Sequence, residues 1–406
     1  MILLCRCLFA VLLFSASTFG TAAGQAESKA DRDIAAFLDR HWQHPLPPQG
    51  QPPAAFSPLE ASLAPADCGT CHVQQWRDWQ TALHSKAMSP GLLGQLQVML
   101  PDATDEHQAC LICHAPLAEQ QAELQKALAA RKAKAGSHAD GLTCAGCHVR
   151  SHQRHGPPRR DGTTPAKNAP LPHDGWQVSA AYGDSRFCAA CHQFPADWPA
   201  LNGKLLENTH EEWKASRHAR ENRSCQNCHM PDRRHLWRGI HDREMTRNGL
   251  DIAFSPQPAA KGRVAADLKI INRGVGHAFP TYVTPRVTVD LAQEDSAGRI
   301  IPDTRELHVI ARQVSLDLSR ELADTRILAD ESRRYAYRRP RHARAVAISA
   351  RIRVEPDYFY ADFYRATLRD PAYAKGHATL RQALRLAEQS PYILYQSRLP
   401  LDVPGR

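Results

Sequence analysis

Hydrophobic and polar residues alternate along several stretches of the C-terminal half of the chain. The pattern is clearest over residues 264–270, 287–291 and 346–354, where every second residue is apolar. A period of two predicts strands with one buried face. The Asp-Ser-Ala-Gly segment at residues 295–298 predicts a hairpin turn after the second of these strands. This half is therefore predicted to be a small β-sandwich.

Other stretches have the period of a helix or no period at all. Near the C-terminus, Leu380, Ala383, Leu384 and Ala387 fall on one face of a helix predicted over residues 377–388. Residues 116–134, rich in Ala, Glu, Gln, Leu and Lys, also predict a helix, and residues 33–44 a shorter one. Several prolines predict extended chain over residues 45–65 and a loop over residues 152–173.

The first residues have the composition of a secretory signal peptide. A single early charge, Arg6, precedes an apolar run at residues 8–14, and small residues follow at 21–24. The run is short for a bilayer span. We expect residues 1–26 to be a signal peptide that directs export to the periplasm. A retained membrane anchor stays open as an alternative, because the segment is only weakly basic.

Five copies of the pattern Cys-x-x-Cys-His lie between residues 67 and 250. They contain ten of the 12 cysteines, and the other two, Cys5 and Cys7, lie in the N-terminal segment. The pattern is the attachment signature of c-type haem: two thiols bond the porphyrin and the histidine is the proximal iron ligand. We predict five covalently bound haem c groups. The motif residues are Cys68, Cys71 and His72; Cys110, Cys113 and His114; Cys144, Cys147 and His148; Cys188, Cys191 and His192; Cys225, Cys228 and His229.

Zinc is the main alternative for paired cysteines. A four-cysteine zinc site uses two Cys-x-x-Cys pairs, so five pairs leave one unmatched. Zinc also gives no reason for a histidine after every second cysteine. The repeated histidine therefore favours haem.

Charge and composition agree with a cofactor-rich region. The chain has 406 residues and a formal net charge of +9. A positive balance is typical of proteins that bind nucleic acid or anionic membranes. Haem propionates add negative charge that this sum omits, and arginines and lysines near the haems are their natural partners. We expect no nucleic-acid partner, while peripheral membrane association stays open.

The sixth ligand of each iron separates an electron carrier from an enzyme. Sixteen of the 21 histidines lie outside the motifs, and methionines are few, so a second histidine is expected on most irons. The predicted distal ligands are His84, His155, His218, His235 and His277. For each, the alternative is a solvated or propionate-bonded histidine. We expect His41, His44, His308, His342 and His377 to lie on the surface.

Two of the predicted distal histidines share a local pattern. His84 and His218 each end the sequence acid-Trp-x4-His, which begins at Asp78 and at Glu212. His277 lies in a Gly-rich turn, Gly-Val-Gly-His-Ala-Phe-Pro-Thr, where glycines allow close approach to a flat ring.

The haem-motif half resembles the multihaem cytochromes typified by the tetrahaem cytochrome c-554 family. The resemblance rests on residues 68–88, on Glu-Glu-Trp-x-x-Ser-x-His at 211–218, and on residues 225–231 with His235 beyond. The turn at His277 is similar to one in related multihaem cytochromes. The resemblance covers roughly residues 67–290 and implies a periplasmic redox protein with closely stacked haems. Five motifs instead of four is a departure, so haem pairing does not carry over directly.

These patterns give an α+β chain: a multihaem cytochrome c fold of short helices and loops, then a β-sandwich-like domain. The predicted segments are a signal peptide at 1–26, a polar, Pro-rich leader at 27–66, a pentahaem domain at 67–250, a β-sandwich-like domain at 260–372, and a C-terminal helix and tail at 373–406.

Two classes of function stay open. The favoured one is an electron carrier between redox partners, a quinol-linked dehydrogenase on one side and a terminal reductase or oxidase on the other, in a respiratory or anaerobic chain. The other is a haem-dependent oxidoreductase with one open-coordinate haem that acts on a small N-oxide or sulfur oxyanion. No catalytic residue is predicted. In pentahaem nitrite reductases, the catalytic haem usually has a lysine in place of the motif histidine. None of the five motifs here has that lysine, which argues against nitrite reduction.

Overall fold

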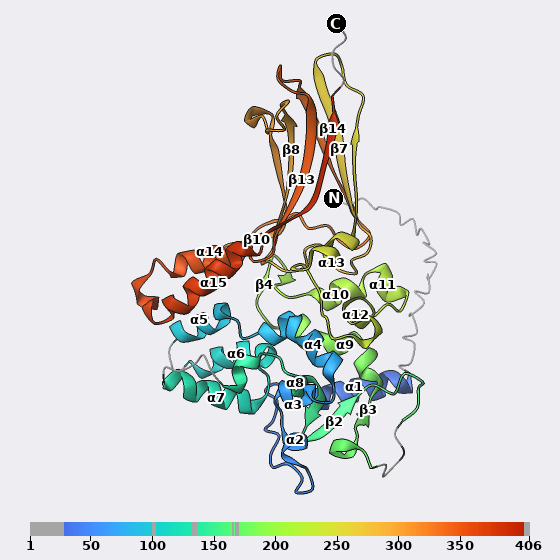
Figure 1. Ribbon diagram of the computed structural model, residues 1–406, viewed down its shortest axis with the longest axis vertical. Helices are drawn as coiled ribbons and strands as arrows, with labels where there is room; N and C mark the ends of the chain where they lie inside the picture. Colours follow the sequence, from blue (N-terminus) through green and yellow to red (C-terminus); the bar gives the residue numbers. More distant parts are fainter. Residues whose placement is uncertain (1–27, 100–102, 131–135, 165, 167–169, 402–406) are drawn as a thin grey trace, which may run out of the picture.

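The computed structural model describes residues 28–99, 103–130, 136–164, 166 and 170–401. The predicted signal peptide, with Cys5 and Cys7, lies outside these residues. The described chain forms two parts (Figure 1): a helix-and-loop region, residues 28–249, at the bottom of the view, and a β region, residues 250–401, above it. Of the helices in the described part of the chain, none is long and apolar enough to cross a membrane.

The helix-and-loop region consists of short helices joined by long connections. The predicted helices at 33–44 and 116–134 are present: α1 begins and ends a few residues earlier than predicted, and α7 is shorter than predicted. The helices are α1 Lys29–His41, α2 Pro58–Ala61, α3 Pro65–Gly69, α4 Val73–Thr81, α5 Pro90–Val98, α6 Thr104–His114, α7 Ala118–Ala129, α8 Cys144–His148, α9 Arg186–His192, α10 Thr209–Lys214, α11 Arg217–Arg220, α12 Cys225–His229 and α13 Arg243–Asn248. Five short strands accompany them: β1 Val149–Arg150, β2 Gln153–Gly156, β3 Gln177–Val178, β4 Ala200–Leu201 and β5 Lys204–Leu205.

The β region contains two antiparallel sheets that face each other (Figure 1), as the alternating pattern predicted. One has the order β12-β7-β6 and the other β14-β13-β8-β9, with a separate β10–β11 hairpin. The strands are β6 Leu250–Pro256, β7 Arg263–Asn272, β8 Arg286–Glu294, β9 Glu306–Ile310, β10 Arg312–Val314, β11 Glu321–Asp324, β12 Ser332–Pro340, β13 Ala347–Glu355 and β14 Tyr392–Pro400. The predicted turn at 295–298 follows β8, and Gly298 has the positive φ of 72° that such a turn requires.

The main hydrophobic core lies between the two sheets. Side chains such as Leu268, Leu291 and Ile352 point inward from β7, β8 and β13 and are fully buried. Burying one such side chain stabilises a fold by about 1.5–3 kcal/mol. The hydrophobic clusters of the helix-and-loop region are smaller, so the β region holds the larger side-chain core of the described chain.

A helical hairpin connects β13 to β14, which are neighbours in the second sheet. It consists of α14 Tyr358–Thr367 and α15 His377–Gln389, the second of which matches the helix predicted over 377–388. The hairpin extends from the β region over α5 (Figure 1). Glycines in α5 allow the close contact, because a Cβ at Gly91 would meet Tyr364 and one at Gly94 would meet Leu380. The segment after α15, predicted as tail, contains β14, whose consecutive Tyr, Ile, Leu and Tyr residues at 392–395 are typical of strands.

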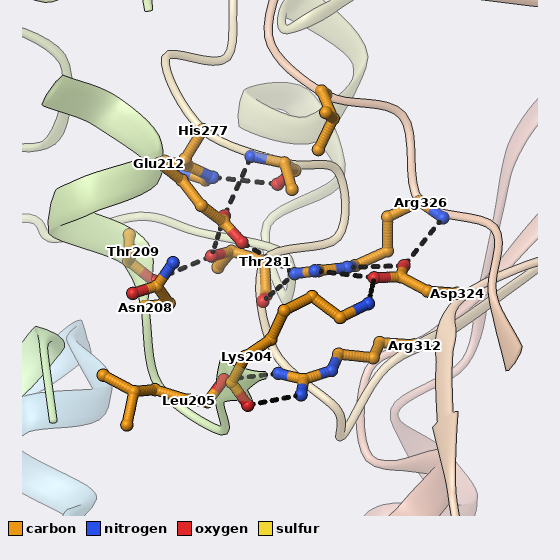
Figure 2. A network of polar contacts seen from close by, with 12 residues as sticks. Lys204, Leu205, Asn208, Thr209, Glu212, His277, Thr281, Arg312, Asp324 and Arg326 are labelled. Carbon is orange, nitrogen blue, oxygen red and sulfur yellow. Dashed lines mark hydrogen bonds and ion pairs between the residues drawn. The ribbon is translucent and has the colours of Figure 1, made fainter. Parts of the chain in front are cut away.

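Two buried arginines join the β region to the helix-and-loop region (Figure 2). Arg312, 1% exposed, pairs with Glu321 and donates hydrogen bonds to the carbonyl groups of residues 201, 204 and 205. Arg326 donates to Glu212 in α10 at 2.8 Å and to Asp324 at 2.9 Å. Arg326 also donates to the Thr281 carbonyl oxygen at 2.8 Å, so its hydrogen bonds hold the 277–282 loop of the β region against α10, while those of Arg312 hold β10 against β4 and β5.

Candidate functional site

Each Cys-x-x-Cys-His motif lies at a helical turn. Motifs two to five lie within α6, α8, α9 and α12. The first begins at Cys68 in the last turn of α3 and continues past its end, where the His72 amide donates to the Cys68 carbonyl oxygen at 2.9 Å. A spacing of three residues places both cysteines on one face of a turn. Polar caps start two of these turns: Thr143 accepts from the Gly146 amide, and Ser224 forms a capping box with Asn227. The sequence therefore builds five local cofactor attachment points.

All five motifs line one cavity of about 3500 Å³. A pocket for one drug-sized ligand measures roughly 300–1,000 Å³, so this cavity has room for several porphyrins. Its walls include all ten motif cysteines and all five motif histidines, together with His84, His155, His218, His235 and His277. Arginines such as Arg154, Arg186 and Arg238 also line it, and they suit propionate carboxylates.

Thiols from different motifs lie in contact. Cys144 donates a hydrogen bond to Cys68, which lowers the pKa of Cys68 to about 7. Cys188 likewise donates to Cys225 and lowers the pKa of that thiol to about 7. A third contact joins motifs two and four, where Cys191 donates to Cys113. Cofactors attached at these thiols must be neighbours: first with third, second with fourth, and fourth with fifth.

The described cysteines form no disulfide, and the described residues hold no cluster of three or more metal-binding side chains suited to a bare ion.

Four motif histidines are each held in orientation by a hydrogen bond at Nδ1. The Nδ1 atoms of His114, His148 and His229 lie 2.8, 2.8 and 2.6 Å from the backbone carbonyl oxygens of residues 87, 155 and 238. That of His192 lies 2.8 Å from the Tyr282 hydroxyl. A ligating histidine donates its second ring N–H in this way, which leaves Nε2 for the metal. Burial also lowers the pKa of His148 and of His192 to about 4, so both rings are neutral at pH 7, the form that binds iron.

Three predicted distal histidines lie in ring contact with motif histidines. The ring centres are 6.2 Å apart for His148 and His235, 6.3 Å for His192 and His84, and 6.4 Å for His229 and His277. Metal–imidazole bonds of about 2 Å and a distance of about 1.1 Å from nitrogen to ring centre, from ring bonds of about 1.33 Å, place two imidazoles on one metal about 6 Å apart. The spacings of these pairs fit an iron between them.

The acid of the repeated acid-Trp-x4-His pattern anchors a distal histidine on another segment. Asp78 accepts from the His235 amide at 3.0 Å and from Arg234 at 2.7 Å. Glu212 accepts from the Ala278 amide, next to His277, at 3.0 Å. The sequence repeat therefore has a structural meaning that spacing alone did not reveal: each acid positions a loop that carries a distal histidine.

The other two predicted distal histidines have different surroundings. His218 is 3% exposed, with Nε2 3.2 Å from the Arg273 carbonyl oxygen and Nδ1 buried without a partner. His155 packs on Phe37 and His41, and its carbonyl oxygen accepts from His148. No contact of the described chain sets either ring opposite a motif histidine, so their ligand roles stay predictions.

Two histidines differ from the sequence analysis. His41, expected on the surface, is only 2% exposed, because it packs on Phe37 and its Nε2 lies 2.8 Å from the Cys147 carbonyl oxygen. His173, which has no predicted role, lines the cavity and lies close enough to His72 to interact with it electrostatically. Its place after Pro172 in a Pro-rich loop gave no signal of this role.

Comparisons with known proteins agree with this site. Residues 67–149 match the family model described as cytochrome c554 and c-prime, so this segment is a domain of that family and the resemblance in the sequence is confirmed over these residues. Among solved structures, the chain is similar to one titled a penta-heme cytochrome c552 from Thermochromatium tepidum, with 18% identity, a TM-score of 0.59, and coverage of 85% of this chain and 100% of that chain. At this identity the similarity shows the fold. No curated protein sequence matches.

Proposed function

We propose that the chain is an exported pentahaem c-type cytochrome that carries electrons between redox partners in a respiratory or anaerobic chain. The observation that carries the proposal is the single cavity lined by all five Cys-x-x-Cys-His motifs. Haem c supplies a one-electron iron couple whose potential depends on its axial ligands. The protein supplies the attachment, the spacing and those ligands.

The thiol contacts support a continuous path through the cavity. They join the first motif to the third and the fourth motif to both the second and the fifth. The third motif lies near the fourth, since the Cys147 thiol is close enough to Cys188 and Cys191 for their charges to interact. The fourth motif is therefore the junction of a branched arrangement, which suits transfer between separate entry and exit points.

The ring contacts support bis-histidine ligation at three motifs. We assign His235 opposite His148, His84 opposite His192, and His277 opposite His229. Two strong imidazole donors exclude other ligands and favour electron transfer. The proposed partners are a quinol-linked dehydrogenase and a terminal reductase or oxidase, in the periplasm.

A second candidate is an oxidoreductase with one open-coordinate haem. The surroundings of the second motif favour it, because the half-buried phenol of Tyr360 in α14 lies close enough to Cys110 for their charges to interact. A phenol is a weaker competitor for an iron position than an imidazole. A small N-oxide or sulfur oxyanion is the proposed substrate class.

The spin state of the oxidised holoprotein separates the two functions. For the carrier we expect only low-spin ferric signals in electron paramagnetic resonance (EPR) and optical spectra, because paired imidazoles give low-spin iron. Cyanide, nitrite or nitric oxide should leave these spectra unchanged. A high-spin signal that shifts on adding one of these ligands would instead establish the open-coordinate enzyme.

A further inference from the structure

A line of hydroxyl groups connects the fourth motif to a buried carboxyl group. His192 Nδ1 lies 2.8 Å from the Tyr282 hydroxyl, which lies within hydrogen-bonding reach of Thr209. The Thr209 hydroxyl lies 2.6 Å from Glu207 Oε1 and 2.7 Å from the Thr281 hydroxyl. Thr281 in turn lies 2.9 Å from Glu212 Oε2. For His114, His148 and His229, the partner of Nδ1 is a backbone carbonyl oxygen. Of these four motif histidines, only His192 is therefore connected to a series of side-chain hydroxyl groups.

The contacts need more hydrogens than the threonines supply. Three short contacts run from Glu207 to Thr209, from Thr209 to Thr281 and from Thr281 to Glu212. Each needs one hydrogen, and a hydroxyl supplies only one. The two threonines therefore satisfy two of the three contacts. One of the two carboxyl groups must carry the third hydrogen.

Glu212 is the carboxyl group whose surroundings suit an acceptor. It receives hydrogen bonds from the Arg326 guanidinium at 2.8 Å and from the Ala278 amide at 3.0 Å (Figure 2). Both partners are donors only, and an ionised carboxylate is the matching acceptor. Glu207 has no cation among its contacts in the described structure: the groups around it are Glu212, Tyr282, Tyr360, Cys113 and the Thr209 amide. Burial raises the pKa of Glu207 to about 8, in the same direction.

We propose that Glu207 is a neutral carboxylic acid at pH 7 and that its proton is linked to the oxidation state of the haem held by His192. The carboxylic acid of Glu207 donates its hydrogen bond to the Thr209 hydroxyl. This fixes which hydrogen bonds remain for Tyr282, whose hydroxyl accepts from His192. Tyr282 is thus a positioning residue for His192, and Glu207 is a proton-carrying residue. The inference rests on the proposed haem at the fourth motif.

The sign of the linkage follows from charge. Loss of the Glu207 proton adds a negative charge near the haem, which favours the ferric state and lowers the reduction potential. The potential of one haem should therefore fall as the pH rises through the pKa of Glu207. Reduction of that haem should in turn favour the protonated acid, since linkage is reciprocal.

Infrared difference spectroscopy of the holoprotein, reduced minus oxidised, tests the proposal. We expect a C=O band of a protonated carboxyl group that shifts in D2O, together with one haem whose potential depends on pH. Glu207→Gln should abolish both, because the amide keeps a donor to Thr209 but cannot ionise. Glu211→Gln, a neighbouring exposed carboxyl group, is the matched control and should keep both. Tyr282→Phe should keep the infrared band but weaken the pH dependence.

Three results would overturn the proposal: no such band in the unsubstituted protein, a band that persists in Glu207→Gln, or an unchanged pH dependence in that variant. Each of them leaves the haem count and spin states intact, so failure here is distinct from failure of the proposed function.

Discussion

His277→Ala is expected to convert one low-spin haem to high-spin without loss of haem. His277 reaches the cavity from the β region, and its ring lies 6.4 Å from that of His229 with 12° between the planes. Its Nδ1 contacts the Ala278 carbonyl oxygen at 3.0 Å, which leaves Nε2 for the metal. Removing this donor leaves Cys225 and Cys228 attached but opens the sixth position. EPR of the oxidised variant measures the change, and the potential of that haem should rise.

Two further variants make the His277 result specific. His277→Met should restore a low-spin haem with a raised potential, because thioether sulfur is a weaker donor to ferric iron than imidazole. His377→Ala, which replaces a histidine of α15 outside the cavity lining, should leave every spin state unchanged. A His277→Ala protein with full haem content and no high-spin signal would remove His277 from the ligand set.

Arg326→Leu is expected to destabilise the holoprotein by about 3–5 kcal/mol, the usual cost of leaving one member of a buried ion pair without its partner. The Arg326 and Glu212 side chains are only 5% and 11% exposed. Glu212 also anchors the Ala278 amide and Thr281, so the loop that carries His277 should loosen as well. Chemical denaturation of the holoprotein measures the loss of stability.

A double variant and a surface pair serve as controls for Arg326→Leu. Adding Glu212→Gln should recover part of the stability, because the buried charge is then gone. Arg365→Ala, in an exposed pair with Glu388 (41% and 47% exposed), should have a far smaller effect. An Arg326→Leu protein as stable as the unsubstituted protein would show that the junction of the two regions does not depend on this pair.

Local sequence predicts the attachment points of this protein well. Each motif needs only one helical turn, and the alternation over 264–270, 287–291 and 346–354 sets the buried face of a strand without distant information. The helix α15 can also be predicted from local sequence, since its apolar residues recur at helical spacing over consecutive turns. The strands and helix expected from these patterns are present as β7, β8, β13 and α15.

Contacts between distant segments could not be predicted in the same way. Cys68 meets Cys144, and Glu212 meets Arg326, only because the chain folds back over many residues. The repeat that begins at Asp78 and Glu212 was visible, but its anchoring role needs the positions of His235 and Ala278. Glu207 carries no sequence signal at all, because its protonation depends on burial and on two threonines.

The most direct test of this account is the mass of the mature, exported protein under denaturing conditions. Covalent attachment survives denaturation, so each Cys-x-x-Cys-His motif that holds a haem adds one haem mass to the chain. We predict five additions on a chain that lacks the N-terminal segment. Fewer than five, after expression in a host competent for cytochrome c maturation, would contradict the pentahaem assignment and the electron path built on it.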